Sequence, residues 1–130
     1  MQIKERGQPA ISFKELDVFR RAVLMVKYTY EVTGKFPAEE QAGIISQMRR
    51  AAITIPASIA EGTSRHTVKD RQHFVDVALG ALSEIYAQFL VAVELQYLPK
   101  SEMRRFERGY DALRPLLIAY QRSIQPGSNS

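Results

Sequence analysis

Apolar residues recur at spacings of three and four along almost the whole chain, and this pattern constrains the fold more than any other feature. Such spacing places apolar side chains on one face of an α-helix, whereas a half-buried strand would alternate at every second residue. No window alternates for long enough to form a strand. Glycines and prolines divide the pattern into four expected helices, at about 13–33, 38–61, 67–97 and 100–124.

Four helices joined by short connections pack as antiparallel neighbours, so we predict an all-α, antiparallel up-down four-helix bundle. We expect the bundle to span 13–124, between an irregular N-terminal arm at 1–12 and a frayed C-terminal tail at 125–130. Thr67 is placed to cap the third helix. Gly34 is placed to end the first helix in a left-handed conformation.

The composition narrows the classes of function. The chain has 130 residues with 18 Lys and Arg against 14 Asp and Glu, a net charge of +4, and it has no cysteine. The lack of cysteine excludes a disulfide scaffold, a thiolate zinc site, an iron–sulfur cluster and a cysteine nucleophile. No secretory signal is apparent at the start, and the most apolar stretch, 74–98, contains three carboxylates. We therefore expect a soluble cytoplasmic protein without a membrane partner.

A second stripe runs along the expected second and third helices, opposite the core stripe, and is rich in small residues. Its members that we assign to a subunit interface or a structural role are Gln47, Arg50, Ser58, Glu61, Gly80 and Glu84. A surface that meets only solvent would be richer in Lys and Glu, so a second packing partner is indicated. We predict a homo-oligomer with Arg50 and Glu84 as a candidate ion pair. The alternative is a monomer in which neighbouring helices bury this stripe.

Cations gather at the expected start of the third helix. Arg65, Lys69 and Arg71 stand there against a single carboxylate, Asp70. The free N–H groups and the dipole of a helix N-terminus favour anions and disfavour cations, so cations at this place require a reason. A bound phosphate backbone is one such reason, and a solvated charged surface is the other.

Further cations extend the candidate nucleic-acid-binding set. Lys14 lies at the same end of an up-down bundle, and Arg20 and Arg21 form a doublet on the first helix. A second basic cluster lies at the opposite end, early in the fourth helix. Its members are Lys100, Arg104, Arg105 and Arg108. This cluster ranks lower because Glu102 and Glu107 offset its charge.

Metal binding and catalysis have weaker support. His66, Asp70 and His73 have ligand-like spacing, but the set offers too few ligands, so we expect no metal and no cofactor. Glu61 and Glu84 could be paired carboxylates, yet the Glu-x-x-His repeats of di-iron bundles are missing. The sequence also lacks a glycine-rich phosphate loop and the strings typical of hydrolases. We therefore predict that the protein is not an enzyme.

Three strings, in order, carry a resemblance to a known family. They are QMRRAA at 47–52, IPASIAEG at 55–62 and FVxxALGxxxE at 74–84. Over about residues 13–120 the chain resembles the four-helix-bundle proteins encoded by intervening sequences in bacterial 23S rRNA genes. It departs from the family pattern at Ser58, where Asn is usual, and at Ala81, where Ser is usual.

The resemblance implies a bundle that assembles into a ring or barrel, with a homopentamer as the first expectation. It also implies a role with RNA or other nucleic acid, and a related branch of the family serves as an accessory to reverse transcriptases in retroelements. We predict a non-enzymatic oligomer that binds RNA or DNA through backbone phosphates, because no aromatic-rich RNA-binding string is present. The alternative is a protein-interaction scaffold or an accessory subunit for a nucleic-acid enzyme.

Overall fold

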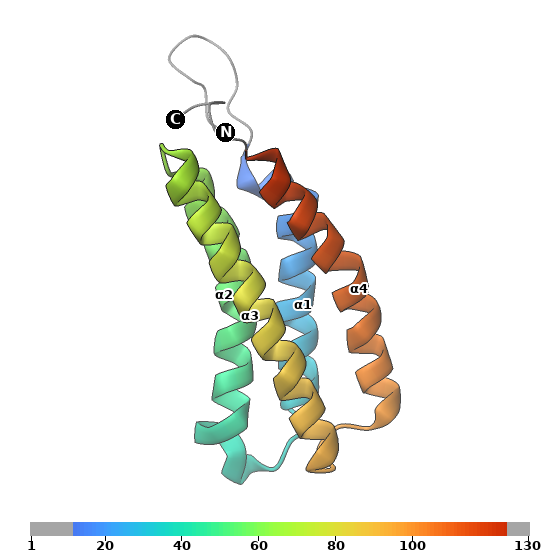
Figure 1. Ribbon diagram of the computed structural model, residues 1–130. Helices are drawn as coiled ribbons and strands as arrows, with labels where there is room; N and C mark the ends of the chain where they lie inside the picture. The colour runs from blue at the N-terminus through green and yellow to red at the C-terminus, as the bar shows by residue number, and fades with distance from the viewer. Residues whose placement is uncertain (1–11, 125–130) are drawn as a thin grey trace.

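The computed structural model describes residues 12–124, which form four long helices (Figure 1). These are α1 (Asp17–Thr33), α2 (Ser46–Thr63), α3 (Val68–Glu94) and α4 (Lys100–Ser123). The described part contains no strand, so the predicted all-helical chain with four helices is confirmed. The predicted arm at 1–12, apart from Ser12, and the predicted tail at 125–130 lie outside the described residues.

The four helices lie side by side, and Figure 1 shows consecutive helices running in alternate directions. Helices α2 and α3 share the most extensive contact, and α4 packs against both α1 and α3. Cross-helix hydrogen bonds join the start of α3 to the end of α4, since Gln72 donates to the backbone oxygen of Ile124 and Gln121 donates to Asp76. The start of α4 therefore lies beside the later turns of α3 and the end of α1.

The core is built from the apolar stripes of all four helices. Phe89 of α3 stacks on Phe106 of α4 with ring centroids 3.9 Å apart, and Tyr28 of α1 stacks on Phe89 with ring centroids 6.1 Å apart. Burial of one such large apolar side chain contributes roughly 1.5–3 kcal/mol. This aromatic stack joins three helices and holds α4 at a fixed distance from α1.

One of the two predicted helix caps is confirmed, and the other is wrong. Thr67 caps α3, as expected, because its hydroxyl accepts the backbone N–H of Asp70 at 3.1 Å. Gly34 ends α1 with right-handed dihedral angles (φ −64°, ψ −16°), so the expected left-handed cap does not form there. Its N–H continues the helical pattern by binding the Tyr30 carbonyl at 3.1 Å. A left-handed residue instead follows α3, at Gln96 (φ 64°).

The second helix begins later than the sequence predicts. Residues 38–45 form two short helical turns, η2 (Ala38–Glu40) and η3 (Gln41–Ile45), and α2 starts only at Ser46. The cause is Gly43, whose dihedral angles (φ −107°, ψ −119°) are not helical. A third short turn, η1 (Phe13–Glu15), precedes α1.

Helix α3 is the one described helix whose length and composition would suffice to cross a membrane. The core helix of a water-soluble protein passes the same test. One face of α3, including Leu82, Ile85 and Phe89, is buried within the assembly of helices. The absence of a membrane partner stays a prediction.

Candidate nucleic-acid interface

The cations at the start of α3 are largely committed to contacts within the chain. The guanidinium of Arg65 forms an ion pair with Glu61 and lies over the Phe74 ring, 4.9 Å from its centroid. The Nε of Arg71 donates to the backbone oxygen of Arg65 at 2.9 Å. Both arginines are half-buried, whereas Lys69 is exposed. The structure therefore brings the three predicted residues together, but two of them hold the connection between α2 and α3.

The cations before and within α1 are more accessible. Lys14 in η1 is exposed, and Arg20 and Arg21 are exposed on the first turns of α1. Both arginines lie near Asp17, with N–O distances of 3.7 and 3.2 Å. An exposed pair of this kind contributes ~0–1 kcal/mol, so a phosphate can replace the carboxylate at little cost.

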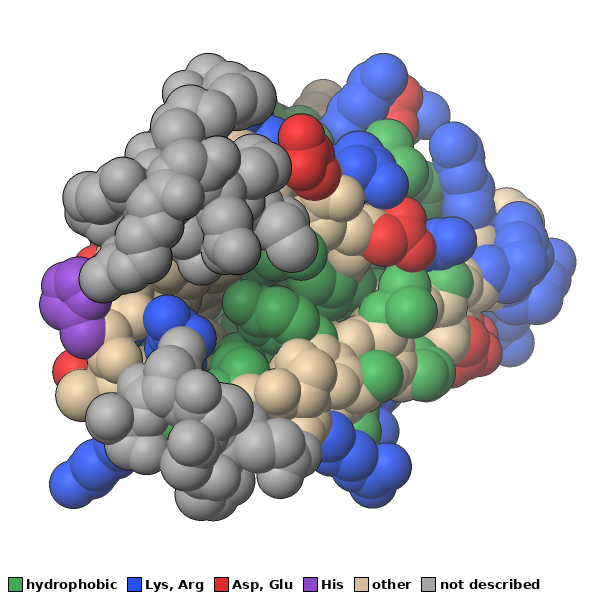
Figure 2. Space-filling view, turned by 90° about the horizontal axis from the view of Figure 1, so that it is seen from above, with side chains coloured by type: hydrophobic (Ala, Val, Ile, Leu, Met, Phe, Trp, Pro, Cys, Tyr) green, Lys and Arg blue, Asp and Glu red, His purple; other side chains and the backbone are tan. Residues whose placement is uncertain are grey.

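In the structure, the basic cluster on α4 is a stronger candidate for phosphate binding than its sequence indicates. Its four cations, Lys100, Arg104, Arg105 and Arg108, are all exposed. We call these residues the α4 basic face. Figure 2 shows Lys and Arg side chains gathered on the side of the molecule where Figure 1 places α4.

The two carboxylates that offset this cluster in the sequence are directed to neighbouring helices. Glu102 accepts the hydroxyl of Tyr28 on α1 at 2.6 Å, and Glu107 accepts that of Tyr86 on α3 at 2.7 Å. Both glutamates are half-buried. Burial, together with the Glu102 contact, raises the pKa of Tyr28, and the Glu107 hydrogen bond raises the pKa of Tyr86. The glutamates thus serve as structural hydrogen-bond acceptors, and the α4 basic face keeps its arginines toward solvent.

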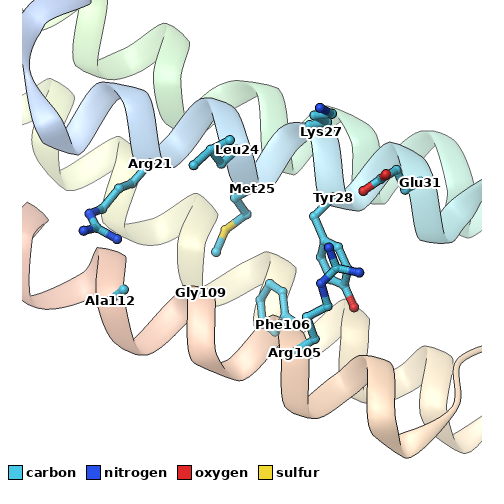
Figure 3. A pocket seen from close by; sticks show the side chains of 10 residues that line it. All are labelled: Arg21, Leu24, Met25, Lys27, Tyr28, Glu31, Arg105, Phe106, Gly109 and Ala112. Carbon is cyan, nitrogen blue, oxygen red and sulfur yellow. The ribbon is translucent and has the colours of Figure 1, made fainter.

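A groove of about 370 Å³ lies between α1 and α4 (Figure 3). Met25 and Tyr28 point from α1 toward α4, and the guanidinium of Arg105 lies 4.8 Å from the centroid of the Tyr28 ring. Leu24 of α1 and Gly109 of α4 also line the groove. Sequence reasoning missed this site because its lining residues come from helices that are far apart in the chain.

The residues assigned to a subunit interface are mostly on the outside of the single chain. Gln47, Arg50, Glu61, Gly80 and Glu84 are exposed. No ion pair joins Arg50 to Glu84 within the described part of the chain. A Cβ atom added at Gly80 would meet nothing within 4 Å, so this point of α3 is open on its outer side.

Ser58 departs from this pattern, because its side chain is buried with 7% of its surface exposed. It lies one turn before Gly62, whose added Cβ would stand 3.2 Å from the Cβ of Phe74 on α3. The face of α2 that carries Ser58 therefore packs against α3. The predicted interface residue Ser58 is not accessible to another subunit in this conformation.

The same outer surface carries exposed apolar side chains. Ile53 on α2 and Leu90 and Val91 on α3 each leave more than two fifths of their surface exposed. Exposed apolar side chains that gather on one surface are typical of an interaction site. The α2–α3 outer surface, defined by these three residues with Arg50, Gly80 and Glu84, therefore has the composition of a contact surface.

The residues considered for metal binding or catalysis do not form a common site in the described part of the chain. His66 and His73 are exposed, and His73 packs edge-on against Phe74. Among the described residues, no three His, Asp or Glu side chains are grouped so that they could hold one metal ion. Glu61 binds Arg65 and Glu84 accepts from Gln88 at 3.4 Å, so these two carboxylates have different partners.

A comparison with curated protein sequences gives no match. The family model described as 23S rRNA-intervening sequence protein matches residues 14–119, a range that contains α1, α2 and α3 and most of α4. Since this match covers well over half of the sequence, the chain belongs to the family of 23S rRNA-intervening sequence proteins.

Proposed function

We propose that this chain is a non-enzymatic, oligomeric protein that binds RNA or DNA through backbone phosphates. In this proposal its helices form an antiparallel up-down bundle, and copies of the bundle form a ring, with five subunits as the first expectation. The observation that supports nucleic-acid binding most is the α4 basic face. Its cations face solvent while Glu102 and Glu107 are bound to tyrosines of α1 and α3.

The spacing of this face suits a chain of phosphates. Lys100, Arg104 and Arg108 recur at every fourth position, so successive cations are about 6 Å apart along the helix axis. A repeated row of cations neutralises phosphates and releases counterions, which makes binding strong at low salt and weak at high salt. Copies of the row around a ring would add avidity.

The aromatic side chains favour contact with phosphates rather than bases. Phe89 and Phe106 are buried, and Tyr28 is stacked on Phe89 and covered by Arg105. The exposed ring of Tyr30 is covered by the guanidinium of Arg49 at 4.3 Å. Base recognition in single strands relies on free aromatic faces, so we expect little sequence specificity.

The test is fluorescence anisotropy of labelled single-stranded RNA and DNA titrated with salt. We expect a log–log slope of about −0.7 for each neutralised phosphate. The double variant Arg104→Ala/Arg108→Ala should bind more weakly and reduce the magnitude of the slope by about 1.4, which is two such contacts. The matched control is Lys14→Ala/Lys69→Ala, which removes the same charge at the other end and should change the slope little.

The outcomes separate the possibilities. Absence of binding at low salt would refute nucleic-acid binding and favour the alternative, a protein scaffold or an accessory subunit for a nucleic-acid enzyme. A slope that falls in the Lys14→Ala/Lys69→Ala variant instead would move the interface to the end of the molecule where α3 begins.

The oligomer rests on a separate observation, the α2–α3 outer surface with its exposed Ile53, Leu90 and Val91. We expect light scattering at micromolar concentration to give a mass of several subunits. Gly80→Arg should lower that mass, because the single chain has room for the side chain but a packed interface does not. Ala119→Arg, at an exposed position of α4, should leave the mass unchanged. A monomeric mass for the unaltered protein would refute assembly.

A further inference from the structure

The groove between α1 and α4 has an apolar floor that the described residues leave uncovered (Figure 3). Met25 and Phe106 form the buried part of the lining. Leu24 stands at its edge with 62% of its surface exposed, the highest value among the exposed large hydrophobic residues in the described part of the chain. An exposed leucine beside an open apolar floor gains most from an apolar partner, because its contact with water is then removed.

Small residues form part of the α4 side of the groove. Gly109 and Ala112 line it, and both are exposed. A Cβ atom added at Gly109 would meet only the Cε of Met25, at 3.9 Å, so the packing within the chain does not require glycine there. Glycine within a helix costs about 1 kcal/mol relative to alanine. Its presence leaves room for a second backbone to approach α4 closely.

The charges around the groove define the chemistry of what can fill it. Arg21, Lys27 and Arg105 line it against a single carboxylate, Glu31. Arg21 also faces Asp17, in an exposed pair that holds it weakly. An occupant that complements this lining carries an apolar face for the floor and carboxylates for the cations at the edges.

A helix fits these requirements better than a nucleic acid strand. A groove between two packed helices receives a third amphipathic helix through apolar anchors at positions i, i+3 or i+4, and i+7. A nucleic acid strand that used the apolar floor would need free aromatic faces for its bases, but Arg105 covers Tyr28, and Phe106 is stacked on Phe89 and buried. Phosphates would also leave Leu24 in contact with water.

We propose that the groove between α1 and α4 binds an acidic amphipathic helix of a partner polypeptide. The site shares Arg105 with the α4 basic face, but Leu24, Met25 and Gly109 supply apolar contact that the α4 basic face lacks. Variants of the residues that the two sites do not share therefore test the two proposals separately.

The probe is a fluorescein-labelled acidic peptide about five turns long, with leucines on one face and glutamates on the flanks. We expect it to bind the full chain, whereas a scrambled peptide of the same composition and a peptide with lysine in place of glutamate should bind at least about tenfold more weakly. Equal binding of the scrambled peptide would overturn the proposal, because charge alone would then explain the affinity.

Two variants locate the site. Gly109→Leu should fill the floor, and Leu24→Glu should remove the apolar edge and repel the peptide, so each should weaken peptide binding by at least about tenfold. Ala119→Leu adds the same side chain to an exposed position of α4 that does not line the groove and should have no effect. Circular dichroism melting checks that each variant is folded.

The same variants distinguish this proposal from the proposed function. Gly109→Leu should keep the oligonucleotide affinity and its salt slope, whereas Arg104→Ala/Arg108→Ala should keep most of the peptide affinity. Loss of oligonucleotide rather than peptide binding in Gly109→Leu would assign the groove to nucleic acid and overturn the peptide proposal. No binding of the acidic peptide to the unaltered protein would also overturn it.

Discussion

The hydroxyl of Tyr28 on α1 lies 2.6 Å from a carboxylate oxygen of Glu102 and 2.6 Å from its backbone oxygen, in the first turn of α4. This contact fastens the start of α4 to α1 beside the stack of Tyr28 on Phe89. It also directs the Glu102 carboxylate toward α1 while the arginines of the α4 basic face remain exposed. One tyrosine thus affects both the packing of α4 and the charge that α4 presents.

Replacing Tyr28 with phenylalanine should keep the ring stack and remove this hydrogen bond. We expect the free energy of unfolding to fall by about 1–2 kcal/mol, because the half-buried Glu102 loses a partner. Urea denaturation measures the change. Tyr110→Phe is the matched control, since the Tyr110 hydroxyl has no hydrogen bond to any described residue, and its effect should stay within about 0.5 kcal/mol. Equal losses in the two variants would contradict this assignment.

Stability should fall at high pH because the pKa values of Tyr28, Tyr86, Tyr97 and Tyr120 are raised in the folded chain. The main cause is burial for Tyr28 and Tyr120, and a hydrogen bond donated to a glutamate for Tyr86 and Tyr97. A raised folded pKa gives stability that is fully present below the unfolded value of about 10 and is lost as the pH rises through the folded values. Tyrosinate absorbance near pH 10 should therefore be lower for the native than for the urea-unfolded protein. Superimposable titration curves would disprove the shifts.

The helices themselves were predictable from local sequence, because apolar spacing and the Thr67 cap act within a few residues. The start of α2 was not, since Gly43 breaks the helix beside Glu40. The Glu40 carboxylate accepts the hydroxyl of Tyr97, which is 57 positions away. Such a contact leaves no periodic signal.

The candidate interface depended even more on distant contacts. Arg65 counts as a free cation in the sequence, but Phe74 and Glu61 hold it. Glu102 stands among the arginines in the sequence, but its hydrogen bond with Tyr28, which is 74 positions earlier, directs its carboxylate toward α1. Counting charges along a helix gives the net charge of a cluster and says nothing about which of its side chains face solvent.

Two glycines should respond in opposite ways to alanine. Gly109→Ala should raise the free energy of unfolding by about 0.5–1 kcal/mol, since helix propensity improves and the new Cβ meets only Met25 at an ordinary distance. Gly62→Ala should lower the free energy of unfolding by about 1 kcal/mol or more, because the new Cβ would stand 3.2 Å from the Cβ of Phe74 on α3. Urea denaturation of both variants is the check, and stabilisation by Gly62→Ala would show that α2 and α3 can separate there without cost.

Replacement of Arg49 by lysine should destabilise the folded chain. Its Nε donates to the hydroxyl of Thr33 at 2.9 Å, a second nitrogen lies 3.4 Å from the Tyr30 carbonyl, and the guanidinium covers the Tyr30 ring. These contacts close the C-terminal end of α1, where the helix dipole favours a cation. A lysine ammonium cannot reproduce the planar fork, so Arg49→Lys should lower the free energy of unfolding by about 1–2 kcal/mol. Arg114→Lys is the matched control, because the side chain of exposed Arg114 makes no ion pair or hydrogen bond with the described residues. Its effect in urea denaturation at equal protein concentration should stay within about 0.5 kcal/mol, and a loss as large as that of Arg49→Lys would mean that the Tyr30–Thr33 contacts do not stabilise α1.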